Sequence, residues 1–164
     1  MFSGCSSLTS LQENLLPATT LASYCYNSMF YGCKALTTLP ENLLHATTLA
    51  QNCYGYMFSD CSSLTNSPKL PATTLAQGCY NRMFYNCSSL TTLPENLLPA
   101  TTLESGCYSY MFGSCSSLTN APKLPATTLA QECYYEMFYN CKGLTSAPKL
   151  PATKLASDCY RYMF

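Results

Sequence analysis

Residues 107–118 read CYSYMFGSCSSL, and close copies of this stretch recur along all 164 residues of the chain. The pair Met-Phe marks the register, with successive steps of 28, 28, 26, 28, 26 and 26 residues between Met1, Met29, Met57, Met83, Met111, Met137 and Met163. Self-similarity at a period of about 20 to 50 residues is the sequence signature of stacked coils. The sequence therefore predicts a repeat solenoid of the α/β class with coils of 26–28 residues.

The two unit lengths differ in one Pro-containing segment. Long units carry a segment such as 93–99, LPENLLP, whereas short units carry one such as 121–125, APKLP. The register is kept on both sides of the two additional residues. We therefore expect a surface loop here, where insertions cost little and leave the core positions unchanged.

Each unit offers one extended stretch and one stretch with helical spacing. Residues 117–122 are a short, mostly extended run that ends at Pro122, and they predict one short strand per coil, paired in parallel with its copies. Residues 127–141 lack Pro and Gly, and apolar residues recur there at steps of four. This spacing predicts a helical or 3-10 segment, with Thr127 or Thr128 as its N-cap.

The repeated motif resembles that of a known family. The run C-S-S-L-T, a following Pro, and then M-F-x-x-C resemble BspA-like leucine-rich repeats, which repeat Phe-x-x-Cys-x-x-Leu with a following Pro. The resemblance extends over the whole chain. It implies a leucine-rich-repeat fold and a location outside the cell or on a bacterial cell surface, where several members of the family take part in adhesion.

The organisation follows from the repeat count. We expect residues 1–164 to form a single leucine-rich-repeat solenoid segment of about six coils without capping units. Because solenoids need polar caps over their terminal cores, the segment would be part of a longer chain or of a filament built by end-to-end contacts.

The composition argues against several classes of protein. The formal net charge is zero and charged residues make up 10% of the chain, which disfavours nucleic-acid binding. No apolar run is long enough for a membrane span. The single histidine, His45, stands where other long units have Pro17 or Pro99, and no phosphate loop or acid/base pair is evident, so we expect neither enzymatic activity nor a cofactor.

The twelve cysteines come in pairs eight residues apart, and no C-x-x-C motif suggests a metal site. Eight helical residues span about 12 Å, which is too far for a disulfide within a unit. Two interpretations stay open: buried thiols in ladders, or some disulfides if the winding is less regular. The expected core ladder comprises Cys25, Cys33, Cys53, Cys61, Cys79, Cys87, Cys107, Cys115, Cys133, Cys141, Met29, Met57, Met83, Met111, Met137, Phe30, Phe58, Phe84, Phe112 and Phe138.

Two surfaces are candidates for partner binding. The positions before Met and after Phe are three residues apart, and one tyrosine per unit occupies one or the other of them: Tyr31, Tyr56, Tyr85, Tyr110, Tyr139 and Tyr162. Tyrosines in such a strip either make interface contacts or merely cover neighbouring coils. The second surface is a polar ladder on the expected strands, formed by Thr38, Asn66, Thr92, Asn120 and Ser146.

The leading hypothesis is a non-catalytic, surface-displayed module for adhesion or for interaction with a protein or a glycan. The alternative is a structural spacer or fibre subunit that binds further copies of itself end to end or laterally.

Overall fold

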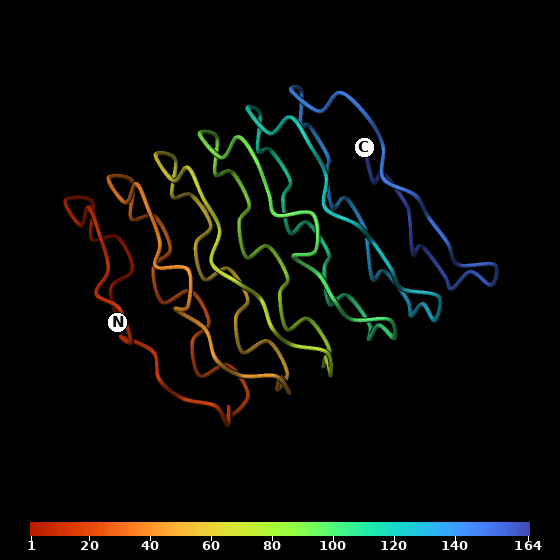
Figure 1. Cartoon of the computed structure of the whole chain (residues 1–164), viewed down its shortest axis with the longest axis horizontal. Helices are drawn as coiled ribbons and strands as arrows, with labels where there is room; N and C mark the ends of the chain where they lie inside the picture. The colour runs from red at the N-terminus through yellow and green to blue at the C-terminus, as the bar shows by residue number, and fades with distance from the viewer.

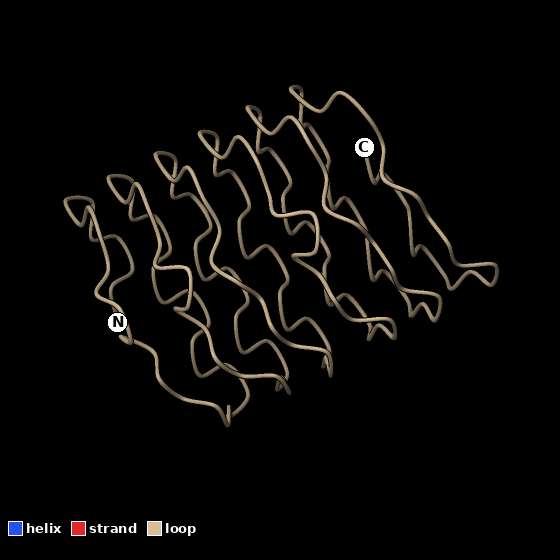
Figure 2. Cartoon of the chain, viewed as in Figure 1, coloured by secondary structure: helices blue, strands red, loops and turns tan.

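The computed structural model describes residues 1–164, and it places consecutive units side by side as a row of coils (Figure 1). It contains no helix and no strand (Figure 2). None of the 80 backbone–backbone hydrogen bonds belongs to such an element. Regular pairing is limited to three isolated parallel bridges, Ser10 with Thr38, Thr48 with Thr74, and Thr102 with Thr128.

The prediction of a helical or 3-10 segment over residues 127–141 is wrong, because residues 131–140 form consecutive turns instead. The copy at residues 51–61 shows why. The N–H of Cys53 donates to Ala50, three residues back, whereas the N–H of Tyr54 donates to Cys79 in the next coil. This alternation continues to Cys61. An α-helix keeps its N–H groups within the segment, whereas here every second N–H joins neighbouring coils.

A positive φ at every fourth residue gives these turns their shape. In residues 51–61 it occurs at Asn52 (50°), Tyr56 (56°) and Asp60 (61°). Asn52 lies at the third position of the turn closed by Cys53 and Ala50, where a type II turn requires a positive φ. We call residues 51–61 and their copies at 23–33, 77–87, 105–115 and 131–141 the turn segments.

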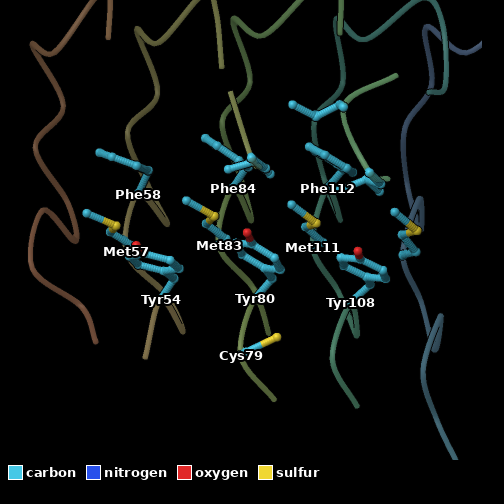
Figure 3. Packing of buried hydrophobic residues seen from close by; sticks show 14 of the residues in the cluster. Tyr54, Met57, Phe58, Cys79, Tyr80, Met83, Phe84, Tyr108, Met111 and Phe112 are labelled. Atoms are coloured by element: carbon cyan, nitrogen blue, oxygen red, sulfur yellow. The ribbon is translucent and has the colours of Figure 1, made fainter. Parts of the chain in front are cut away.

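Each turn segment from 51–61 onward buries a Cys-Tyr pair and a Met-Phe pair. Stacking these pairs on their copies builds continuous ladders of side chains (Figure 3). The ring of Phe58 lies 5.6 Å from that of Phe84, and the ring of Tyr54 lies 5.7 Å from that of Tyr80, each pair being stacked. The aromatic ladders form the centre of one core cluster that runs through the coils.

Burial of the expected core ladder has two exceptions. Every member is buried except Cys25, which is exposed, and Met29, which is partly buried. Within residues 1–164 the turn segment 23–33 has a complete copy on one side only. The expectation that Cys25 is a buried ladder residue is therefore corrected.

All twelve cysteines are free thiols, and the second cysteine of each coil has a specific bonding role. Its Sγ donates to the carbonyl of the ladder Phe in the preceding coil, at 3.2 Å from Cys61 to Phe30 and at 3.2 Å from Cys87 to Phe58. The same bond is made by Cys33, Cys115 and Cys141. These thiols thus add a polar link between coils inside an apolar core.

The Pro-containing residues 39–46 and their copies form the loop segments. The two additional residues of the long units were expected to stay on the surface. The asparagine does so, since Asn42 and Asn96 are exposed, but the expectation is wrong for the leucine: Leu43 is 0% exposed and Leu97 is 3% exposed. A turn closed by the N–H of Leu43 and the carbonyl of Pro40 directs the leucine inward. The insertion therefore enlarges the core.

Side chains join the loop segments wherever a short unit follows a long one. The amide of Asn66 donates to the carbonyl of Leu39 at 2.9 Å and accepts from the N–H of Leu39 at 2.9 Å. Asn120 makes the same two contacts with Leu93.

These side chains also explain why the strand expected over residues 117–122 does not form. Thr119 donates its N–H to Thr91, but the side chain of Asn120 then takes the place of backbone pairing. Pro122 follows two residues later and has no N–H to donate.

Candidate partner-binding face

The outward positions of the turn segments bring the predicted tyrosines onto one face, which we call the tyrosine face. It has two rows. The row directly before Met contains Ser28, Tyr56, Arg82, Tyr110, Glu136 and Tyr162, and the row directly after Phe contains Tyr31, Ser59, Tyr85, Gly113 and Tyr139.

The alternation of tyrosines with small residues has a steric reason. A Cβ atom added to Gly113 would lie 3.0 Å from the ring of Tyr85 in the preceding coil, so the absent side chain leaves room for the ring. Ser59, between Tyr31 and Tyr85 in the same row, is only 1% exposed. Large and small residues therefore interlock between coils.

The rings form a connected series of edge-to-face contacts. Tyr110 lies 6.3 Å from Tyr85 and 5.3 Å from Tyr135, measured between ring centroids, and Tyr135 lies 6.3 Å from Tyr162. Such T-shaped pairs are favourable arrangements of aromatic rings. Sequence reasoning missed Tyr135, although its pairing with Tyr134, where other units have Asn, Gly, Ser or Arg, was a visible departure from the repeat.

Arg82 lies at the middle of the tyrosine face. Its guanidinium carbon is 4.1 Å from the ring centroid of Tyr110 and 5.4 Å from that of Tyr56, within the range of cation–π attraction. It also donates to the hydroxyl of Tyr56. Burial lowers the pKa of Arg82, but its contacts with Tyr56 and Tyr110 outweigh burial, so the pKa lies above its ordinary value.

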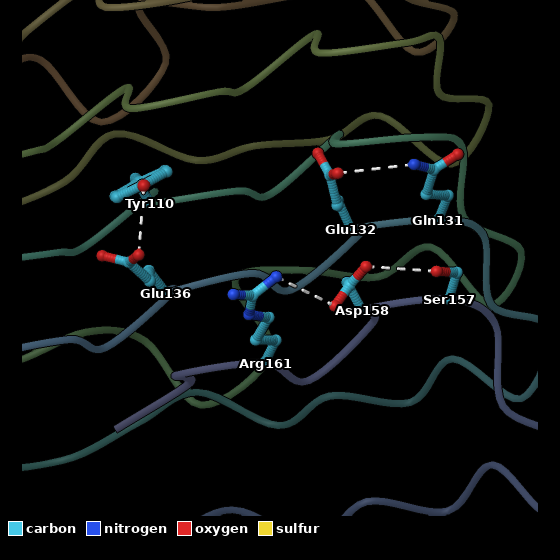
Figure 4. A network of polar contacts seen from close by, with 7 residues as sticks. All are labelled: Tyr110, Gln131, Glu132, Glu136, Ser157, Asp158 and Arg161. Carbon is cyan, nitrogen blue, oxygen red and sulfur yellow. Dashed lines mark hydrogen bonds and ion pairs between the residues drawn. The ribbon is translucent and has the colours of Figure 1, made fainter.

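Acidic side chains accept hydrogen bonds from the tyrosines. The hydroxyl of Tyr110 donates to Glu136 at 3.1 Å (Figure 4). A hydrogen bond with Asp60 raises the pKa of Tyr31, and one with Glu136 raises that of Tyr135. The hydroxyl groups of Tyr31 and Tyr135 are therefore protonated at neutral pH.

At the C-terminal end the face borders a small charged network. Arg161 lies 3.5 Å from Asp158, whose carboxylate also accepts from Ser157 at 3.1 Å (Figure 4). The guanidinium of Arg161 is 5.0 Å from the ring centroid of Tyr162. Basic groups therefore contact tyrosines at two places on this face.

The exposure of the tyrosines leaves part of each ring accessible. Tyr31, Tyr139 and Tyr162 are 41%, 46% and 59% exposed, and the others are partly buried. The rings thus cover neighbouring coils and also present area to solvent.

The second candidate surface is used partly for internal contacts. Two of its five members, Asn66 and Asn120, are half-buried and hydrogen-bonded to the preceding coil, while Thr38, Thr92 and Ser146 are exposed. This polar ladder therefore offers fewer free groups than the sequence suggested.

His45 is half-buried in its loop segment, and no three His, Cys, Asp or Glu residues are placed to hold a metal ion. No helix of sufficient length and apolarity to cross a bilayer is present. Comparisons of the chain with protein families, with curated proteins and with solved structures gave no match.

Proposed function

We propose that this chain is a non-catalytic interaction module of the leucine-rich-repeat type, displayed outside the cell or on a bacterial surface. It binds a protein or glycan partner through the tyrosine face. The observation that carries the proposal is the joining of partly exposed tyrosine rings to Arg82 across several coils. Tyrosine and arginine are the side chains enriched at the centres of protein interfaces.

The arrangement supports binding because it is rigid before any partner arrives. Each turn segment is tied to the next by backbone hydrogen bonds, such as those from Tyr54 to Cys79 and from Tyr56 to Asn81. The rings therefore lose little conformational freedom on association, which is a main cost of forming an interface.

A variant that removes the rings without disturbing the coils tests this proposal. Serine already occupies both rows, at Ser28 and Ser59, so the chain accepts serine at these positions. The variant replaces with serine Tyr31, Tyr56, Tyr85, Tyr110, Tyr139 and Tyr162.

The measurement is biolayer interferometry of the chain against purified extracellular proteins and a glycan array. For a partner that binds, we expect the serine variant to lose about 100-fold or more in affinity, because several interface tyrosines are removed together. The control carries Thr38→Arg and Thr92→Arg on the polar ladder and keeps its affinity. If only the control variant lost affinity for the partner, the polar ladder rather than the tyrosine face would be the binding surface.

A structural role is the second candidate, and the continuous hydrogen-bond ladder favours it. Bonds such as those from Phe58 to Met83 and from Phe84 to Met111 link successive coils in the same manner, as a stiff spacer requires. Sedimentation velocity separates the two roles. If the chain self-associates and binds neither the purified proteins nor the glycan array, the proposal of a spacer or fibre subunit would be preferred over that of an interaction module.

A further inference from the structure

A small pocket lies within the tyrosine face at the junction of three coils. Its volume is about 200 Å³, and it is lined by Tyr31, Tyr56, Ser59, Asp60, Arg82 and Tyr85. Aromatic rings, a cation and a carboxylate meet in this pocket. A volume of this size suits one small ring-shaped unit rather than an extended chain.

The two charged groups of the pocket are not paired with each other. Neither Arg82 nor Asp60 takes part in any of the ion pairs of the structure. Arg82 directs one donor to Tyr56, and a guanidinium has five N–H groups. Asp60 accepts from the amide of Asn86 at 2.7 Å, and its proximity raises the pKa of Tyr31, while a carboxylate has about four acceptor sites.

The unused donors and acceptors favour a ligand that can both accept and donate. A hydroxyl group does both, so neighbouring hydroxyls of one ligand can accept from Arg82 and donate to Asp60. The charges of Arg82 and Asp60 cancel, which gives the pocket no net attraction for a strongly anionic or cationic ligand. The rings of Tyr31, Tyr56 and Tyr85 supply flat apolar surface beside these polar groups.

We propose that this pocket binds a neutral hexose unit of a glycan. The hydroxyl groups of the sugar bond to Arg82 and Asp60, while its C–H face packs against a tyrosine ring. The inference rests on the proposed interaction function and narrows it to one ligand class at one place on the face.

The test is a two-dimensional NMR titration of the chain with neutral gluco-, galacto- and manno-configured disaccharides and with a glucuronic-acid disaccharide. We expect a neutral sugar to shift the amide signals around Asp60 and Arg82 at concentrations up to about 10 mM, a range suited to a single small site. Shifts caused only by the acidic sugar, or by no sugar in this range, would overturn the proposal.

Variants at matched positions locate the site. Tyr31→Ser removes a ring of the pocket and should weaken binding about 3- to 10-fold, whereas Tyr139→Ser, in the same row but outside the pocket, should leave it unchanged. Asp60→Asn should weaken binding about 10-fold through loss of a charged acceptor. The backbone tolerates this change because Asn86 and Asn140 occupy the equivalent position with positive φ.

The outcomes separate this inference from the broader proposal. Equal losses for Tyr31→Ser and Tyr139→Ser would place the sugar elsewhere on the face and refute the pocket. If no neutral sugar binds, but a protein partner binds the chain and loses affinity for the serine variant, the pocket proposal fails while the interaction function stands. If neither ligand class binds, both fail.

Discussion

Both the turn segments and the loop segments link one coil to the next, but they do so through different groups. In the turn segments, alternate backbone N–H groups reach the neighbouring coil regardless of the outward side chains, as with Tyr54 to Cys79. In the loop segments, where unit lengths differ, backbone pairing is sparse and Asn66 and Asn120 supply the missing bonds. Register is thus held by the main chain on one side and by particular side chains on the other.

This difference explains where the sequence varies. A turn segment accepts Ser, Tyr, Arg or Glu before Met because the backbone, not the side chain, makes the links between coils. A loop segment accepts two extra residues, and at both junctions where a short unit follows a long one an asparagine bonds to the preceding coil. The tyrosine face can therefore change its chemistry without a change of fold.

The largest expected effect is a pH dependence of stability that arises in the turn segments, because nine of the ten buried thiols lie there. Burial raises the pKa of Cys53 to about 11 and those of Cys61 and Cys79 to about 12. In the unfolded chain these thiols ionise at an ordinary pKa. Their contribution to stability is complete below that pKa and is lost as the pH rises toward the folded values.

We therefore expect the melting temperature, followed by circular dichroism, to fall by roughly 10 °C or more between about pH 8 and about pH 11. Cys61→Ala should reduce this fall, since one buried thiol is removed. Cys25→Ala, which removes an exposed thiol, is the matched control and should leave the fall unchanged. Identical pH dependence in both variants would show that thiol burial does not set alkaline stability.

The sequence predicted the structure of the turn segments better than that of the loop segments. The Met-Phe register placed the ladder residues of the turn segments in the core, apart from the exposed Cys25 and the partly buried Met29. It did not distinguish a helix from consecutive turns, since apolar residues four apart satisfy both. The strict period of four, with Gly32, Asp60 and Asn86 at equivalent places, was the signal for positive φ and hence for turns.

In the loop segments the prediction failed for a different reason. Leu43 and Leu97 are buried because an inserted turn points them inward, and the position of an insertion in sequence does not reveal that direction. The pocket around Arg82 was likewise not predictable from one unit. Its residues come from three coils, and only the stacking brings Tyr31, Asp60 and Arg82 together.

The second prediction concerns the asparagine at a junction of loop segments. Asn66→Ala removes the two hydrogen bonds that satisfy the backbone N–H and carbonyl of Leu39, a residue only 4% exposed. Leaving buried polar groups unpaired costs about 1–3 kcal/mol, which urea denaturation can measure.

Asn42→Ala provides the control, because Asn42 is an exposed asparagine of a loop segment. It should change the free energy of unfolding by less than about 0.5 kcal/mol. If Asn66→Ala were as harmless as Asn42→Ala, the side-chain links would not determine the register of the loop segments, and the comparison with the turn segments would lose its basis.

The smallest effect is expected at the ion pair beside the same junction. Lys69 lies 2.9 Å from Glu41, but the two side chains are 61% and 69% exposed, so solvent screens their attraction. The N–H of Lys69 also donates to the carbonyl of Glu41 at 2.8 Å, and this bond persists in Lys69→Ala. A double-mutant cycle with Glu41→Gln should therefore give a coupling free energy below about 0.5 kcal/mol, decreasing further in salt. A coupling above about 1 kcal/mol would make the ion pair, rather than Asn66 and the backbone, a main link between these loop segments.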